Sequence, residues 1–283
     1  MRPANLLTSV ADVLAGIAIS GFYLNQHTDW LPALLLCIST IGLYGGGIVF
    51  NDIFDAELDR IERPERAIPS GVVRIKEAVI LGTILLLIGI ISALAFSLLS
   101  GLIAFMIALS ALIYDKFGKH HTFLGPLNMG LCRGLNLLLG ISVLAASLNE
   151  WYFLGFIPLI YIFSITMISQ GEVHGSDRNK LYAAAFLYMV VISSILYSSW
   201  IQEHFLIALF FMIPFALMIF KPLLKAIQDP AGKNIGKAVK AGVISLILMD
   251  AAWAAAFGQI YIALFIALLL PLTLWLAKRF AVT

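Results

Sequence analysis

Ten long apolar segments follow one another along the chain, and they constrain its fold more than any other feature. A helix needs about 20 apolar residues to cross a bilayer, and only helices and closed barrels satisfy their backbone groups there. The alternation typical of barrel strands is absent, so we expect an all-α polytopic transmembrane helical bundle of about nine to ten spans, forming one domain over residues 1–283. The segments lie at about 6–24, 31–51, 77–97, 99–114, 126–147, 151–169, 181–200, 204–220, 238–257 and 259–277.

Composition supports the membrane interpretation. The chain is 61% apolar and 12% charged, with a mean hydropathy of +0.98, whereas soluble domains are about 25% charged. Cys37 and Cys132 both lie in apolar segments and are interpreted as small core residues rather than a disulfide or a metal site. The first apolar run is expected to be a retained span, not a signal peptide. We predict an integral membrane protein that contacts the lipid bilayer and binds no nucleic acid.

The basic residues lie on alternate sides of the predicted spans. The loops after the first, third, fifth, seventh and ninth segments contain no Lys or Arg, whereas the loops between them are basic. The positive-inside rule then places both termini and every even-numbered loop in the cytoplasm. We therefore predict a protein of a bacterial-type inner (plasma) membrane, with its active-site mouth on the cytoplasmic side.

An acidic motif follows the second apolar segment directly. Asp52, Asp55 and Asp59 have the spacing i, i+3 and i+7, so they would share one face if the helix continued beyond the segment, and Asn51 lies four residues before Asp55. Hard oxygen ligands of this kind suit Mg²⁺, which binds through one or two carboxylates, waters and a substrate phosphate. A solvated acidic end of a helix is the alternative.

A second polar cluster, residues 170–178, follows the sixth segment. Four spans separate it from the acidic motif, so both would open on the same membrane face. Glu172 and Asp177 supply carboxylates, and His174 lies between them. His174 could be a general base, a ligand or a polar loop residue, and the sequence leaves the three open.

Basic residues near these clusters are candidates for binding anions. Arg63 and Arg66 follow the acidic motif in a loop with two prolines and a glycine, and their guanidinium groups could bind phosphate oxygens. Topology and lipid headgroups are the alternative reason for their positive charge. Arg133 lies within an apolar segment, so we expect it to face an anion or an acid inside the bundle.

Other polar residues also interrupt apolar segments. Asn128 and Asn136 could bind neighbouring helices to one another through hydrogen bonds. Asp12 and Asp250 are acids inside predicted spans, where a charge is costly, and either a functional role or structural pairing would explain them.

These motifs together resemble the UbiA superfamily of intramembrane prenyltransferases. Asn51, Asp52, Asp55 and Asp59 match its first signature, N-D-x-x-D-x-x-x-D, and residues 172–177 fall where its second aspartate motif belongs. The resemblance implies a Mg²⁺-dependent transfer of an isoprenyl group from a polyprenyl diphosphate to a small acceptor. An apolar lateral groove would hold the prenyl tail.

The resemblance also implies roles for individual residues. Catalytic residues would be Asp52, Asp55, Glu172, His174 and Asp177. Metal ligands would be Asn51, Asp52, Asp55, Asp59, Glu172 and Asp177. The diphosphate would be bound by Asn51, Arg63, Arg66, Lys119, Asn128, Arg133 and Arg178.

The sequence departs from the family pattern in its second motif, where Glu172 replaces the first aspartate and the last is Ser176 or the shifted Asp177. Residues 171–175 and 132–136 resemble a bacterial subgroup encoded in Ebo-type gene clusters. The acceptor would then be cyclitol- or sugar-like rather than aromatic, and proteins of the same gene cluster would be partners. A transporter, or a non-catalytic polyprenyl-lipid-binding protein, is the alternative function.

Overall fold

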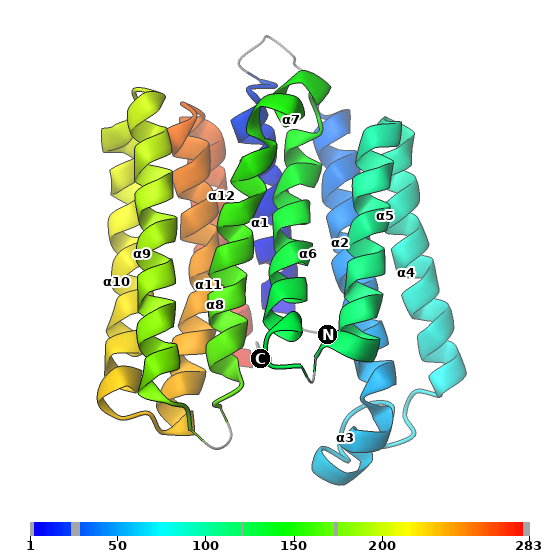
Figure 1. Cartoon of the computed structure of the whole chain (residues 1–283). Helices are drawn as coiled ribbons and strands as arrows, with labels where there is room; N and C mark the ends of the chain where they lie inside the picture. Colours follow the sequence, from blue (N-terminus) through cyan, green and yellow to red (C-terminus); the bar gives the residue numbers. More distant parts are fainter. Residues whose placement is uncertain (1–2, 24–28, 120, 173–174, 280–283) are drawn as a thin grey trace.

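The computed structural model describes residues 3–23, 29–119, 121–172 and 175–279, and within these ranges the chain is a bundle of helices without strands (Figure 1). This confirms the predicted all-α polytopic bundle. The helices, in chain order, are α1 (Pro3–Ser20), α2 (Leu31–Phe54), α3 (Ala56–Glu62), α4 (Ile75–Phe96), α5 (Leu98–Ile113), η1 (Tyr114–Gly118), α6 (Leu124–Ile141), α7 (Ala145–Trp151), η2 (Tyr152–Gly155), α8 (Phe156–Ser169), α9 (Arg178–Ile201), α10 (Phe205–Gln228), α11 (Gly232–Ala256) and α12 (Ile260–Arg279).

Nine of the described helical segments are long and apolar enough to cross a membrane. They include α5 with η1 as one segment, and α7 with η2 and α8 as another. The predicted span 126–147 corresponds to α6, which is not among the nine, and its polar residues Asn128, Arg133 and Asn136 lower its hydropathy. Figure 1 nevertheless shows α6 upright within the bundle. The count of about nine to ten therefore agrees with the structure.

The two most buried helices are α1 and α11, whereas α4, α9 and α12 have most of their residues on the outer surface. Small residues let α1 approach α6 closely. A Cβ added at Gly16 would lie only 2.3 Å from the backbone oxygen of Leu137. Glycine at this position therefore permits backbone contact between two helices that both contribute to the interior of the bundle.

The apolar interior is divided into two main clusters. One is built chiefly from α8, α9, α10, α11 and α12, and the other from α2, α4 and α5, while α1 and α6 contribute to both. Polar side chains gather between the two clusters. At one end of the bundle, α2 ends at Phe54 and the short helix α3 follows, below the other helices in Figure 1.

Candidate active site

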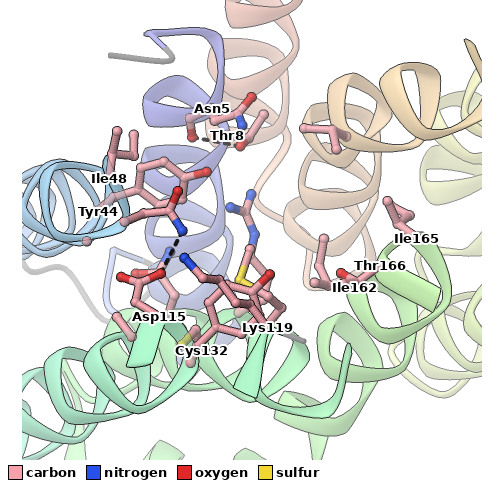
Figure 2. Close-up of a pocket in the computed structure, with 18 of the residues that line it drawn as sticks. Asn5, Thr8, Tyr44, Ile48, Asp115, Lys119, Cys132, Ile162, Ile165 and Thr166 are labelled. Atoms are coloured by element: carbon pink, nitrogen blue, oxygen red, sulfur yellow. Dashed lines mark hydrogen bonds between the residues drawn. The ribbon is translucent and has the colours of Figure 1, made fainter. Parts of the chain in front are cut away.

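A cavity of about 450 Å³ opens between the two apolar clusters. Figure 2 shows Asn5 and Thr8 of α1 on one side of it and Asp115 and Lys119 on another. Its apolar walls come from α2, α5, α8 and α11, including Leu43, Ile48, Ile107, Ile162, Ile165, Val239, Val243 and Leu246. The cavity therefore combines a polar part with walls suited to a hydrocarbon chain.

The C-terminal end of α2 brings Asn51, Asp52 and Asp55 to the cavity. Nδ2 of Asn51 donates a hydrogen bond of 2.8 Å to Oδ1 of Asp115, drawn as a dashed line in Figure 2. Asp115 belongs to the π-helix η1 and is only 4% exposed. Short π-helical segments occur frequently at functional sites.

Only Asp55 separates α2, which ends at Phe54, from α3, which begins at Ala56, and the backbone N–H groups of Asp55 and Asp59 still donate to the backbone oxygens of Asn51 and Asp55. Nη1 of Arg66 contacts both Asp52 and Asp59, and Asp55 lines a space with each of them, which agrees with the expectation that the three aspartates lie on one side. Asp59 does not line the main cavity and instead lies in a smaller outer hollow of about 230 Å³. Asp55 and Lys119 line both spaces, so their side chains stand between the hollow and the cavity.

Cations neutralise the acidic motif in this structure. Lys119 forms an ion pair with Asp55. Nη1 of Arg66 lies 2.6 Å from Oδ2 of Asp59 and 3.6 Å from Oδ1 of Asp52. Two of the predicted diphosphate-binding residues thus lie directly against the predicted metal ligands.

The donor set fits Mg²⁺ in combination with a substrate phosphate. Among the residues that the structure describes, no three His, Cys, Asp or Glu side chains form a ready-made metal site. Mg²⁺ does not require one, because it is commonly held by one or two carboxylates and the phosphates of a substrate. Asn51, Asp52 and Asp55 supply such oxygen atoms at one end of the cavity.

Of the two carboxylates in the second polar cluster, Glu172 lies in the same cavity as the first acidic motif, and Asp177 does not. Glu172, just beyond the end of α8, lines the same cavity as the acidic motif of α2, although the two are far apart in the chain. Asp177 is not part of the cavity lining and accepts a hydrogen bond of 3.0 Å from the backbone N–H of Asn179 as the N-cap of α9. Arg178 donates to the backbone oxygen of Gln228 at 3.4 Å. The roles assigned to Asp177 and Arg178 stay predictions.

The remaining predicted residues are dispersed. His174 lies outside the described residues. Arg63 lines the outer hollow with Arg66. Asn128 accepts a hydrogen bond from the thiol of Cys132 at 3.7 Å and does not line the cavity, so its predicted contact with the diphosphate stays a prediction.

Arg133 does line the cavity, and it pairs with an acid as its position inside an apolar segment suggested. Its Nε lies 2.5 Å from Oδ2 of Asp12, which is fully buried. Asn136 donates to the same oxygen at 2.9 Å and accepts from the Thr40 hydroxyl at 2.7 Å. We call Asp12, Thr40, Arg133 and Asn136 the inner polar cluster.

Sequence reasoning missed Asp115 as a site residue. The available signal was its position, since it follows the apolar segment 99–114 as the acidic motif follows segment 31–51. Two helix ends that carry acids on the same membrane side can meet. That signal does not distinguish a site residue from a solvated helix end.

Comparison with known proteins decides the family. The sequence model described as the UbiA prenyltransferase family matches residues 13–227, which is most of the chain. The chain belongs to the UbiA prenyltransferase family. This confirms the resemblance inferred from the first acidic motif, whereas the narrower resemblance to the Ebo-type subgroup stays a prediction.

Relatives of this UbiA family member include two archaeal proteins named digeranylgeranylglyceryl phosphate synthase. The protein of Methanosphaera stadtmanae is 30% identical over 66% of this chain and 67% of its own length. That of Saccharolobus solfataricus is 32% identical over 54% of each chain. The matches therefore span about half to two thirds of these relatives.

Two solved structures share the fold. One, described as giving insight into digeranylgeranylglyceryl phosphate synthase in membranes, aligns with a TM-score of 0.69 at 22% identity over 92% of this chain and 95% of its own. The other, an apo UbiA homologue from Aeropyrum pernix, has a TM-score of 0.53 at 18% identity, over 96% of each chain. At these identities the likeness concerns the fold alone.

Proposed function

We propose that this integral membrane protein transfers an isoprenyl group from a polyprenyl diphosphate to a small hydroxyl-bearing acceptor, with Mg²⁺ as cofactor. One observation carries the proposal. Carboxylates and cations meet at one end of an apolar-walled cavity, and Asp55 and Lys119 stand at its junction with the outer hollow. A ligand with a charged head and a hydrocarbon tail matches that arrangement.

Asn51, Asp52 and Asp55 would hold Mg²⁺, and Glu172, which lines the same cavity, is a further candidate ligand. The ion, when bound, would neutralise charge on the diphosphate as it leaves. Lys119, Arg63 and Arg66 would bind phosphate oxygens directly. Fixed donors of this kind stabilise the charge that develops on a leaving group.

The transfer breaks the bond between C1 of the prenyl group and the diphosphate oxygen, and the electron pair leaves with the diphosphate. C1 gains carbocation character, and the acceptor oxygen forms the new bond to it. The acceptor's proton then needs a base. We propose Asp115 as this base, because it lines the cavity and is oriented by a hydrogen bond from Asn51. Asp52 and Asp55 are engaged in ion pairs with Arg66 and Lys119, whereas Asp115 forms no ion pair with the described Lys and Arg residues.

The acceptor class is inferred from the relatives. Their name denotes a product in which a glyceryl phosphate carries two geranylgeranyl groups. A glycerol-type or cyclitol acceptor would present a hydroxyl group to C1, whereas an aromatic acceptor would present a ring carbon. We favour the hydroxyl because the cavity contains several hydrogen-bonding side chains, among them Asn5, Thr8 and Thr40.

Orientation follows from the distribution of charge. The end of the bundle that carries α3 and the acidic motif also carries the basic loop around Arg63 and Arg66. Basic loops remain cytoplasmic. We propose that the mouth of the cavity opens to the cytoplasm, where a water-soluble diphosphate product can leave.

Donor turnover tests this proposal. Purified protein in nanodiscs would receive geranylgeranyl diphosphate, Mg²⁺ and one acceptor at a time, namely a prenylated glyceryl phosphate, a cyclitol or an aromatic acid. Diphosphate release and a product of the expected mass should appear with a hydroxyl acceptor and should be lost in Asp52→Asn. Donor binding without release from any acceptor would instead support a non-catalytic lipid-binding or transport protein.

A further inference from the structure

The inner polar cluster is distinct from the acidic motif by its depth in the bundle. Thr40 and Asn51 both lie on α2, and Thr40 is about three turns, or roughly 16 Å, further from the mouth. Asn136 is bound to Thr40, and Asn136 and Arg133 both contact the same oxygen of Asp12. The guanidinium group of Arg133 is therefore held at the inner level of the cavity, not beside the predicted metal ligands.

Arg133 has hydrogen-bonding capacity that the protein does not use. It is 7% exposed, it lines the cavity, and its Nη2 has no hydrogen-bond partner among the described residues. A guanidinium group offers five N–H donors, and the contact with Asp12 involves only Nε. Buried polar groups usually have a partner, so these donors are suited to a ligand.

The charge around Arg133 restricts that ligand. Asp12 already compensates the guanidinium group, and the fully buried carboxyl of Asp250 on α11 lies beside Asp12. An anion bound here would add uncompensated negative charge inside the membrane, which is costly. A neutral group that accepts hydrogen bonds, such as a hydroxyl or ether oxygen, fits better.

We propose that Arg133, Asn136 and Thr40 form an inner subsite for neutral oxygens of the acceptor, and that Asp12 is a positioning residue for Arg133. Arg133 donates to a hydroxyl or ether oxygen, whereas Asn136 and Thr40, whose donors are used within the protein, accept from a hydroxyl. The inference rests on the proposed function, because it assumes that the second ligand of the cavity is a prenyl acceptor. It also distinguishes Arg133 from Lys119, Arg63 and Arg66, which face the diphosphate. A prenyl chain alone would leave Nη2 of Arg133 without a partner.

The decisive variant combines Asp12→Asn with Arg133→Gln, which removes both charges together. Removing Arg133 alone would leave a buried carboxylate without its cation, and that is strongly destabilising. The matched control is Ser100→Ala, because Ser100 is also fully buried, its hydroxyl lies 2.7 Å from that of Ser142 at the end of α6, and it does not line the cavity. Thermal unfolding would establish that each variant is folded.

Equilibrium binding in nanodiscs would use three probes. Geranylgeranylglycerol is a neutral diol, geranylgeranylglyceryl phosphate adds an anionic group to it, and geranylgeranyl thiolodiphosphate is an unreactive donor analogue. The double variant should bind the diol and its phosphate about 10- to 150-fold more weakly, as expected for lost hydrogen bonds to a charged group. Affinity for the donor analogue should change less than about threefold, the usual scatter of such effects.

Three results would overturn the subsite. Unchanged affinity for the diol would make the cluster purely structural. A loss confined to the phosphate-bearing probe would make it an anion site. An equal loss for the donor analogue would assign Arg133 to the diphosphate.

A second variant keeps the test informative if the double variant does not fold. Asn136→Leu leaves the Asp12–Arg133 pair in place and should weaken diol binding by about 3- to 10-fold, the effect of a neutral hydrogen bond. Unchanged diol binding in this variant would contradict the subsite. Failure of the proposed function would be seen separately, as tight binding of diol and donor to the unaltered protein without product.

Discussion

Exchange of Lys119 for glutamine should have opposite effects on metal and donor binding. Lys119 pairs with Asp55, and their side chains are only 13% and 20% exposed. When Mg²⁺ and the diphosphate bind, Asp55 would move its interaction to the metal and Lys119 would move its own to a phosphate oxygen. Lys119→Gln therefore removes a competitor of the metal and a ligand of the diphosphate.

The magnitudes follow from the burial of the pair. Exposed ion pairs contribute about 0–1 kcal/mol, and breaking a buried pair costs about 3–5 kcal/mol. A hydrogen bond to a charged group contributes about 1.5–3 kcal/mol, so donor affinity should fall about 10- to 150-fold. Binding of Mg²⁺ without donor should become about fivefold tighter, which corresponds to about 1 kcal/mol.

Isothermal titration of Mg²⁺ and of geranylgeranyl thiolodiphosphate, each alone and then together, measures both effects. The matched control is Lys116→Gln, because Lys116 is exposed and stacks over the Phe117 ring at 5.0 Å. The control should change neither affinity by more than about twofold. If Lys119→Gln weakened the binding of both Mg²⁺ and the donor analogue, or of neither, the proposed exchange of partners would be refuted.

Asp115→Asn should lower kcat by about 10²- to 10⁴-fold, the usual contribution of a general base, with donor affinity nearly unchanged in titrations. Arg66→Ala should lower the free energy of unfolding by about 1–3 kcal/mol, because Asp59 would remain buried without its cation, and thermal unfolding in detergent measures this. Gly16→Ala should destabilise the bundle by about 1–3 kcal/mol, since its Cβ would meet the backbone of α6, whereas Gly236→Ala should be neutral or stabilising.

The controls separate these effects from general damage. Arg63→Ala, at an exposed residue of the same loop, should change the free energy of unfolding by less than about 0.5 kcal/mol. Full activity of Asp115→Asn would remove it from the mechanism. Equal stabilities of Gly16→Ala and Gly236→Ala would contradict the close approach of α1 and α6.

The sequence predicted the bundle because a span carries its own signal. Each helix must satisfy its backbone within one continuous apolar run, so length and composition suffice. The end of α2 was also predictable, since acids directly after such a run lie at a membrane boundary. The even number of spans between them correctly indicated that Asp52, near the end of α2, and Glu172, just beyond α8, meet on one side.

Contacts across the bundle were not predictable in the same way. Asp12 and Asp250 each suggested either pairing or function, and only the packing of α1 against α11 brings them together. The one-residue break between α2 and α3 at Asp55 is likewise not encoded by the spacing i, i+3, i+7. The proposed role of Asp115 as a base depends on its hydrogen bond from Asn51, which lies 64 positions earlier in the chain.

The most direct test of the central claim is a single turnover of radiolabelled geranylgeranyl diphosphate in proteoliposomes that contain a prenylated glyceryl phosphate. We predict that label moves into a doubly prenylated product only with Mg²⁺, and that Asp52→Asn abolishes this transfer. Transfer that proceeds equally in EDTA, or that survives in Asp52→Asn, would contradict this prediction.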